Sequence, residues 1–355
     1  MLAPVRSSFN SEDVILLLKD ITGLVEPLPT NIREKKIQSG THYCEMLPLE
    51  YEPSSEYMEA YSFALTQFSK ITADAIAIMS EKIYERKGDN LVIVSLARAG
   101  IPIGILTKRY IEHKYNCKVT HYAISIIRDR GIDHNAMNYI LDRHKGKNIQ
   151  FVDGWVGKGA IFNELKKELQ QYPSVDSSLA VVSDPANITN LCGTHEDILI
   201  ASSCLNAVVT GLISRTFLRS DIIQKDDFHG AAYYEQLSDK DLSNEFLSTI
   251  ENEFDSDYPG TELICDCDGK KIVGEISKCY NVSNLNYIKP GIGEATRVLL
   301  RRVPWRIILN EKYKNSPELL HIIKLAKEKN VTVETSMTNL GNYKVCGIIK
   351  NLADI

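Results

Sequence analysis

The sequence lacks any long hydrophobic run and any closely paired cysteine motif. No apolar stretch approaches the roughly 20 residues that a helix needs to cross a bilayer, and the first ten residues contain no signal-peptide core. None of the eight cysteines forms a C-x-x-C pair, so we interpret them as reduced thiols, several of them buried. These absences predict a cytoplasmic protein that makes no membrane contact.

Two familiar phosphate-binding motifs are also missing. A Walker A loop needs a glycine five positions before its Gly-Lys pair and a Ser or Thr after it, but Val152 and Gly159 stand at these two places. The spacing G-x-G-x-x-G is absent too, because the glycines of this region fall at 154, 157 and 159. Neither a P-loop nor a dinucleotide fingerprint is therefore present.

A different kind of phosphate loop is nevertheless indicated by N-I-Q-F-V-D-G-W-V-G-K-G-A-I, residues 148–161. A short apolar strand ends on Asp153, a glycine-punctuated turn follows, and residues 161–172 have the apolar spacing of a helix. Glycines let the backbone approach an anion, and the first helical N–H groups together with the helix dipole hold it. The alternative is a turn that only connects a strand to a helix.

Strands and helices alternate regularly from residue 90 onward, after a long helical pattern over residues 57–86. Such alternation predicts an α/β fold with a doubly wound parallel sheet. Weaker patterns predict a short helix over residues 12–19 and a strand over residues 198–201. The main predicted strands are 91–97, 119–127, 149–152 and 179–183, and the helices between or after them are 101–115, 134–144, 161–172 and 204–217.

Three polar turns follow strands of this predicted sheet: Arg98–Gly100, Arg128–Asp133 and Asp153–Gly159. Ligands gather at the carboxyl ends of the strands in such sheets, so we expect the three turns to converge. Arginine suits bidentate binding of phosphate. The alternative for the first turn is a tight turn with an incidental arginine. The alternative for the second is a cluster of ion pairs on the surface.

Charge divides the chain. Residues 285–355 contain 12 Lys+Arg and 6 Asp+Glu, whereas residues 221–268 contain 14 acids and 2 bases. The difference predicts three segments: residues 1–250, an acidic linker or hairpin over 251–285, and a basic domain over 286–355. An anionic partner for the basic domain and a solvated surface are both compatible with its charge.

Four motifs together resemble a known family. They are S-L-A-R-A-G-I-P-I-G, H-Y-A-I-S-I-I-R-D-R-G-I-D, F-V-D-G-W-V-G-K-G-A-I and D-F-H-G-A-A-Y-Y. Their order resembles the type I phosphoribosyltransferases. More closely, the motifs resemble a bacterial subfamily encoded in tellurite-resistance (Ter) stress neighbourhoods, fused to a Pelota-like RNA-binding domain and also labelled the cysteine protease StiP family. The resemblance covers about residues 40–246 and 286–355.

The resemblance implies a phosphoribosyltransferase that uses phosphoribosyl diphosphate (PRPP) with Mg²⁺ and an unidentified base as acceptor. It implies catalytic roles for Asp153, Arg128 and Arg130, with Asp153 also near the metal. The implied PRPP-binding residues are Ala97, Arg98, Ala99, Gly100, Gly154, Val156, Gly157, Lys158, Gly159 and Ala160. Gly154 stands where the family has a second acid, and Val156 where it has a threonine.

The C-terminal segment resembles the kink-turn RNA binders that include Pelota. P-G-I-G-E-A-T-R-V-L-L-R-R matches their glycine-led loop that opens a basic helix. By that match the candidate RNA contacts are Gly291, Glu294, Arg297, Arg301 and Arg302. A docking domain without RNA is the alternative, and Gly293 stands where those binders usually have asparagine.

Two other functions stay open. One is a sensor that binds a nucleotide or PRPP without turnover and is coupled to RNA binding. Whether the chain forms a homodimer is also open. The other is a cysteine protease, for which Cys192, His195 and Cys204 are the candidate residues, although buried thiols explain them as well. A metal site at Cys265, Cys267 and Cys279 is indicated more weakly still, because C-D-C-D-G-K-K resembles a strand entering a hairpin turn.

Overall fold

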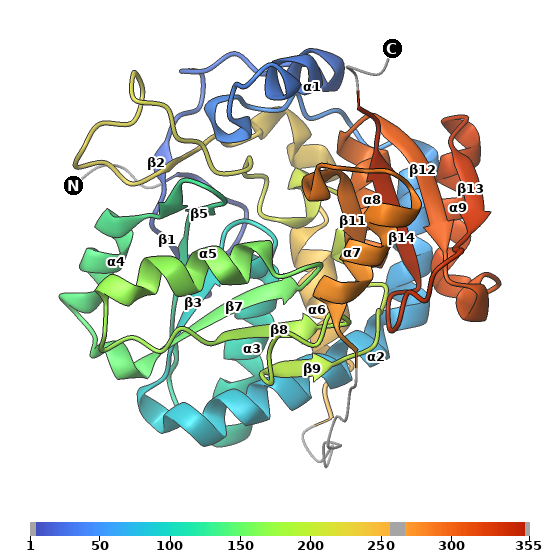
Figure 1. The fold of residues 1–355 in the computed structure, drawn as a ribbon. Helices are drawn as coiled ribbons and strands as arrows, with labels where there is room; N and C mark the ends of the chain where they lie inside the picture. Colours follow the sequence, from blue (N-terminus) through green and yellow to red (C-terminus); the bar gives the residue numbers. More distant parts are fainter. Residues whose placement is uncertain (1–4, 256–266, 352–355) are drawn as a thin grey trace.

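A computed structural model describes residues 5–255 and 267–351 of the chain. Its larger part is built on a six-stranded parallel sheet with the order β1-β4-β3-β7-β8-β9 (Figure 1). This confirms the predicted α/β class with a doubly wound sheet. The strand bounds are Ile15–Leu16 (β1), Thr120–Ile124 (β4), Val92–Leu96 (β3), Ile149–Trp155 (β7), Leu179–Ser183 (β8) and Cys192–Thr194 (β9).

Helices cover both faces of this sheet. One apolar layer joins alternate strand residues such as Ile93 to α2, α3 and α6, and the other joins Val92 and Val94 to α4 and α5. Successive side chains of a strand point to opposite faces, which is why the strands are apolar throughout. The helix bounds are Thr30–Gln38 (α1), Ser55–Lys87 (α2), Gly100–Tyr115 (α3), His134–Leu141 (α4), Ala160–Glu168 (α5) and Ser243–Glu251 (α6).

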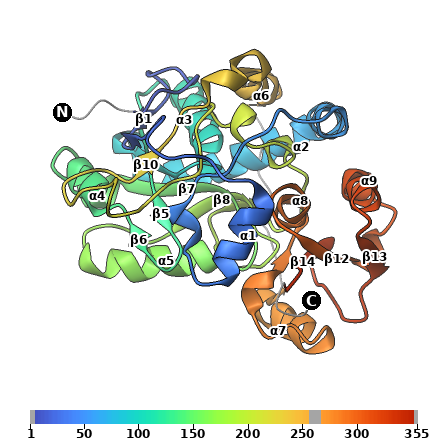
Figure 2. The same ribbon diagram turned by 90° about the horizontal axis from the view of Figure 1, so that it is seen from above.

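The C-terminal part forms a second, smaller sheet with the order β11-β14-β12-β13. Helices α8 and α9 lie on one face of it and α7 on the other, and α8 lies between the two sheets (Figure 2). The bounds are Ile288–Pro290 (β11), Val345–Ile349 (β14), Pro304–Leu309 (β12), Thr332–Thr335 (β13), Gly269–Cys279 (α7), Ile292–Arg301 (α8) and Leu320–Glu328 (α9).

Several local predictions are wrong. Residues 12–19 contain strand β1 and the start of β2, Lys19–Asp20, which pairs with β10, Gly230–Ala231. Residues 204–217 contain only the short 3₁₀ turn Ala207–Val209 and irregular backbone instead of a helix. Residues 198–201 form no strand, and β9 lies just before them. Another short pair joins β5, Ile126–Ile127, to β6, Gly131–Ile132.

The predicted linker is also corrected in part. Helix α7 begins at the capping residue Asp268, whose carboxylate accepts from the backbone N–H of Lys271 at 3.0 Å, where a hairpin was predicted. The rest of the hairpin prediction, including Cys265, lies outside the described residues. The three segment boundaries stay predictions.

Candidate functional site

Strand order reverses between β3 and β7, which is where a doubly wound sheet usually binds its ligand. The turn that leaves β3 lies against the end of β7, which runs to Trp155 and not only to Asp153 as predicted. A Cβ atom on Gly100 would lie 2.7 Å from the Val152 carbonyl oxygen and 3.1 Å from the Asp153 Cα atom, so only glycine fits there. The first and third predicted turns therefore converge as expected.

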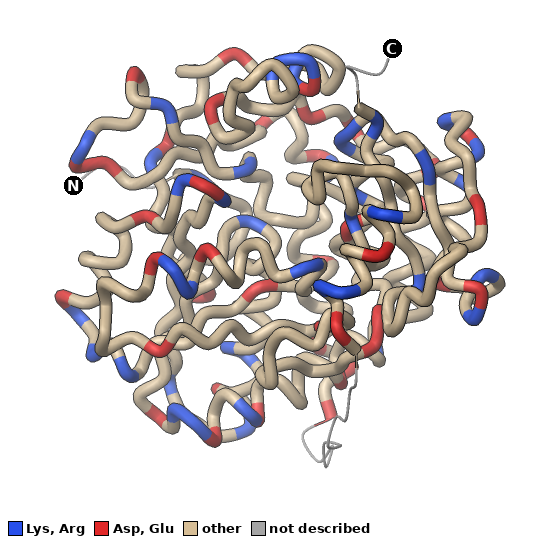
Figure 3. Tube along the Cα trace, in the orientation of Figure 1, with Lys and Arg blue, Asp and Glu red and all other residues tan. Residues whose placement is uncertain are grey.

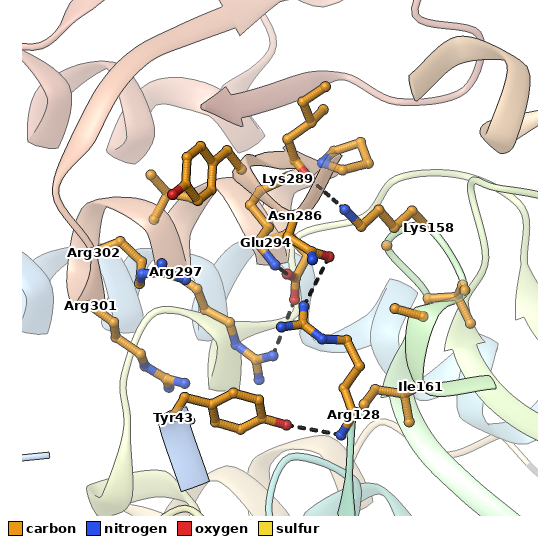
Figure 4. Close-up of a pocket in the computed structure, with 18 of the residues that line it drawn as sticks. Tyr43, Arg128, Lys158, Ile161, Asn286, Lys289, Glu294, Arg297, Arg301 and Arg302 are labelled. Carbon is orange, nitrogen blue, oxygen red and sulfur yellow. Dashed lines mark hydrogen bonds and ion pairs between the residues drawn. The ribbon is translucent and has the colours of Figure 1, made fainter. Parts of the chain in front are cut away.

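A cavity of about 470 Å³ opens beside Asp153, between residues of α5, α1 and α8. Figure 4 shows a close-up of the residues that line it. Residues of both sheets line it, and they come from segments up to 270 residues apart. Its lining contains eight cations and two acids. The cations are Arg33, Arg128, Lys158, Arg215, Lys289, Arg297, Arg301 and Arg302, and the acids are Asp153 and Glu294.

The glycine turn presents unused backbone donors to this cavity. Val156 donates its amide to the Ser183 carbonyl oxygen at 3.0 Å and is therefore not available to a ligand. Within the described residues, none of the six amides from Gly157 to Phe162 donates to a protein acceptor. The last three belong to the first turn of α5, whose N–H groups have no partner inside the helix. The turn can accept an anion.

Asp153 lies at the edge of the same cavity. Its Oδ1 accepts from the Gly154 amide at 2.7 Å. Burial raises the pKa of Asp153 to about 6, while the Gly154 hydrogen bond and nearby Arg297 oppose the rise. The Asp153 carboxyl therefore keeps its proton to a higher pH than an exposed aspartate does.

The cations of the cavity repel one another. Burial, Lys289 and Arg128 lower the pKa of Lys158 to about 7, and burial together with Arg33 lowers the pKa of Arg215 to about 9. Arg297 lies over the Trp155 ring at 4.2 Å, and its Nε is buried without a hydrogen bond in the described structure. Positive charge thus exceeds what the protein itself neutralises here.

Several predicted site residues are placed as expected and others are not. Ala99, Val156, Gly157, Lys158, Gly159, Ala160 and Arg128 line the cavity with Asp153, whereas Ala97, Gly100 and Gly154 do not. Arg98 turns away: its guanidinium donates to the Ile213 carbonyl oxygen at 2.7 Å and to Glu50 at 3.2 Å. Arg130 instead pairs with Glu45 at 2.8 Å and lines a separate cavity.

The predicted RNA contacts face inward. Glu294, Arg297, Arg301 and Arg302 line the same cavity, and Figure 4 shows them opposite Arg128 and Lys158. Gly291 does not line the cavity, and its amide donates to the Val345 carbonyl oxygen at 2.8 Å. The start of α8 is closed by the larger domain, because Asp197 accepts from the Ile292 amide at 2.9 Å and Trp155 packs against Gly293. The two predicted sites are therefore one cleft.

Several lining residues were not predicted from the sequence, among them Arg33, Tyr43, Arg215, Asn286 and Lys289. They come from the N-terminal segment, an irregular stretch and β11, and no local pattern singles them out. Figure 3 shows acids and bases interspersed along the trace of both domains, so the cluster is invisible to net charge. Only the tertiary fold brings these residues together.

The magnesium prediction meets a sparse set of ligands. Mg²⁺ prefers oxygen ligands and is often bound by one or two carboxylates plus substrate phosphates. In the described residues no three His, Cys, Asp or Glu side chains cluster as a metal site. Asp153 is the one uncommitted carboxylate of the cavity, since Glu294 pairs with Arg297 at 3.3 Å. The Mg²⁺ site stays a prediction.

The candidate protease residues lie elsewhere, at the far edge of the sheet. Cys192 Sγ lies 3.5 Å from His195 Nε2, and His195 Nδ1 lies 2.9 Å from the Asp184 carbonyl oxygen. Both residues are buried. Cys204 is not part of this pair; burial raises the pKa of its thiol to about 12. Cys267 and Cys279 form no metal cluster in the part of the chain that is described.

The fold and the cleft define an α/β protein with a parallel sheet, a C-terminal α/β domain and a cleft between them that is lined by more cations than acids. Residues 7–251 match the family described as "Tellurite-like stress resistance cysteine protease StiP", and residues 267–351 match the Pelota RNA-binding domain. The chain belongs to the StiP family. A cysteine protease StiP from Acinetobacter baylyi is 32% identical over 366 residues, covering 97% of this chain and 94% of the relative.

Solved phosphoribosyltransferases are also similar, but distantly. The hypoxanthine-guanine enzyme from Bacillus anthracis is 16% identical with a TM-score of 0.25, over 33% of this chain and 68% of that chain. The Trypanosoma cruzi hypoxanthine enzyme with its product IMP is also 16% identical with a TM-score of 0.25, over 34% and 65%. At such TM-scores the likeness carries no argument.

These comparisons correct the main functional prediction. The prediction of a Mg²⁺-dependent transfer of ribose 5-phosphate from PRPP to a base is wrong, because the family and the 32% identical relative are both described as cysteine proteases. No finding supports PRPP or a base acceptor as partners. The resemblance to a stress-resistance family with a Pelota RNA-binding domain is confirmed. Within the described residues, no helix is both long and apolar enough to span a membrane.

Proposed function

We propose that this StiP-family enzyme binds a phosphorylated ligand in the cleft between its two domains. One observation carries the proposal: eight cations and only two acids line a cavity of about 470 Å³. Burying like charges together is costly unless an anion joins them. The ligand would supply that anion.

The glycine turn favours phosphate over other anions. The four turn amides from Gly157 to Ala160 and the next two amides of α5 have no protein acceptor in the described structure, so they can donate to an anion at the N-terminus of α5. Lys158, Arg128, Lys289 and Arg297 add positive charge around the same cavity. A tetrahedral anion with several acceptor oxygens matches such a set better than a planar carboxylate with two.

Calorimetric titration with uridine monophosphate (UMP) and with inorganic phosphate tests the proposal. We expect saturable binding that weakens at high salt and that Arg297→Gln weakens by about tenfold or more, the size of one charge-assisted hydrogen bond. Arg143 is exposed and does not line the cavity, so Arg143→Gln is the matched control. Absence of binding by both compounds would overturn the proposal.

Peptide hydrolysis by a cysteine is the second candidate, favoured by the family description and by the Cys192–His195 pair. A proton on His195 Nδ1 donates to the Asp184 carbonyl oxygen, which leaves the Nε2 lone pair towards the thiol as a base would require. Because Cys192 is fully buried on β9, a peptide reaches it only if β9 and α2 separate.

Hydrolysis of a denatured protein substrate by the purified chain tests this candidate. Cys192→Ala should abolish hydrolysis, whereas Cys204→Ala should retain it if the protein still folds. Mass spectrometry after brief iodoacetamide treatment should show alkylation of Cys192 before that of buried Cys346. Hydrolysis that persists in Cys192→Ala would exclude this pair as the nucleophile and base.

A further inference from the structure

A second cavity of about 310 Å³ adjoins the first and shares three arginines with it. Arg33 comes from α1, Arg215 from the irregular stretch after the sheet, and Arg301 from the last turn of α8. The second cavity lies between these arginines and the segment 48–54. The three side chains therefore stand where the two cavities meet.

These three arginines have few partners. The Arg33 side chain is only 5% exposed, yet its Nε has no hydrogen bond in the described structure. Among the described residues no carboxylate pairs with Arg33, Arg215 or Arg301, because Glu34 pairs with Arg302 and Glu50 with Arg98. Burial lowers the pKa of Arg33, and its neighbour Arg302 lowers it further. Arg215 and Arg301 are half-buried, and Arg301 Nε also donates to Asn206 Oδ1. Guanidinium groups without a carboxylate partner are a ready site for phosphate oxygens.

We propose that Arg33, Arg215 and Arg301 hold the second phosphate of a single-stranded RNA end whose terminal phosphate lies in the glycine turn. The inference rests on the proposed function and names its ligand class. The first cavity takes the terminal nucleotide, and the backbone then passes the three arginines into the second cavity. Both domains contact the strand.

Aromatic rings next to the cations favour a nucleic acid over a small bisphosphate. The Tyr43 ring has Arg128 at 5.7 Å and Arg215 at 4.7 Å from its centroid, and it lines the first cavity. Trp155 lines the first cavity and Tyr57 the second. Basic grooves with interleaved aromatic rings are typical of single-strand binding, because every base has a face that stacks.

The smaller domain favours RNA, and its orientation favours an end over a duplex. Residues 267–351 match an RNA-binding domain, and its α8 supplies Arg297 to the first cavity and Arg301 to both. Asp197 and Trp155 close the glycine-led loop at the start of α8, so an RNA duplex cannot lie across it in this arrangement. The two small cavities admit a strand but no double helix.

Equilibrium binding of UMP, the 5′-phosphorylated dinucleotide pUpU and uridine 3′,5′-bisphosphate to the full chain tests the inference. We expect pUpU to bind about tenfold more tightly than UMP and more tightly than the bisphosphate, since the second nucleoside also stacks. The slope of log K against log salt should be steeper for pUpU by about 0.7 per added phosphate contact.

Variants test whether the shared arginines cause the tighter binding of pUpU relative to UMP. Arg215→Leu should reduce the ratio of the two dissociation constants, UMP over pUpU, from about ten to about one. Arg297→Gln should weaken both ligands and keep the ratio, and Arg143→Leu should change neither. If Arg215→Leu does not fold, Arg33→Gln and the salt slopes of the unmodified chain replace it.

Three outcomes would overturn the inference. They are equal affinity of pUpU and UMP, equal affinity of the bisphosphate and pUpU, and an unchanged ratio in both arginine variants. The second outcome would assign the subsite to a small bisphosphate instead of RNA. In each case saturable binding of UMP or inorganic phosphate would leave the proposed function standing, and absence of binding by both compounds would remove the proposed function and this inference together.

Discussion

Asp153 is the residue at which the glycine turn, the loop after β3 and the smaller domain come together. It accepts one hydrogen bond from Gly154 and makes no ion pair in the described structure. Arg297 and Glu294 are its nearest charged influences, and they act in opposite directions on its pKa. The charged form of Asp153 therefore has few interactions to offset the free-energy cost of its desolvation.

The raised pKa of Asp153 has a consequence for stability. With a folded pKa of about 6 against an ordinary value of 3.8, the native state holds the proton more tightly than the unfolded state. Stability therefore falls as pH rises from about 4 to about 6 and stays lower above that window. We expect Asp153→Asn to raise the free energy of unfolding by about 1–3 kcal/mol at pH 8 and by nothing below pH 4.

Urea unfolding at a series of pH values measures this effect. The matched control is Asp142→Asn at an exposed aspartate, which should change stability little at every pH. A gain for Asp153→Asn that stays constant from pH 4 to pH 8 would contradict the account, because it would arise from packing or hydrogen bonding and not from charge.

At the residue scale the sequence predicted Asp153 and the glycine turn of the cleft, but it did not predict the cleft residues that come from distant segments. Asp153 and the turn after it were predictable because strand, acid, glycines and helix are contiguous. Arg98 and Arg130 were misplaced because their partners, Glu50 and Glu45, lie in a segment without a pattern of its own. Arg33 and Arg215 could not be predicted, since contacts between distant segments leave no local signal.

Helix α8 shows how one element joins the two parts of the molecule. Its first turn donates from Ile292 to Asp197, at 2.9 and 3.1 Å, and Lys344 donates to the same carboxylate at 2.9 Å. The acid belongs to the larger part, and both amides belong to the smaller. Asp197 is therefore a helix cap supplied across the interface.

Removing this cap should loosen the interface. Asp197→Ala leaves two buried amides without an acceptor, for which we expect a loss of about 1–3 kcal/mol in the free energy of unfolding. Hydrogen exchange at Ile292 and Lys344 should accelerate. Asp268→Ala removes the cap of α7 inside the smaller domain and serves as the control, since it should leave exchange at those two amides unchanged. Unchanged protection in Asp197→Ala would contradict the role of the cap.

At the element scale, length decided which predictions succeeded. Helix α2 was predicted because it is long enough for its helical period to be recognised, and β3 and β8 because each is a continuous apolar run of five residues. β9 has three residues and no pattern. Residues 204–217 have the apolar pattern of a helix, but all of them except Asn206 and Arg215 are buried. Their backbone bonds to distant groups: the Leu242 amide donates to the Val208 carbonyl oxygen at 2.7 Å. In this stretch, hydrogen bonds to distant segments take the place of the hydrogen bonds of a helix.

At the scale of the whole molecule, the two apolar layers continue from one domain into the other. Ile292, Leu299 and Ile307 belong to the layer that contains α2 and α3, and Ile288 and Ile308 belong to the layer with α4 and α5. An interface of this kind resembles a domain core more than a hinge. The cleft is therefore a feature of the complete chain and not of either part alone.

A shared core makes the chain unfold as one unit, and a ligand between the domains should stabilise that unit. Two tryptophans report on it: Trp155 packs against α8 at the interface, and Trp305 lies on the smaller sheet with 37% of its surface exposed. In urea, fluorescence of Trp305→Phe, which retains Trp155, should follow the same transition as circular dichroism. UMP at 100 times its dissociation constant should raise stability by about 2.7 kcal/mol for both signals. A fluorescence change that precedes the loss of secondary structure would instead mean that the smaller domain undocks first, and the α8 face would then open to RNA before the fold is lost.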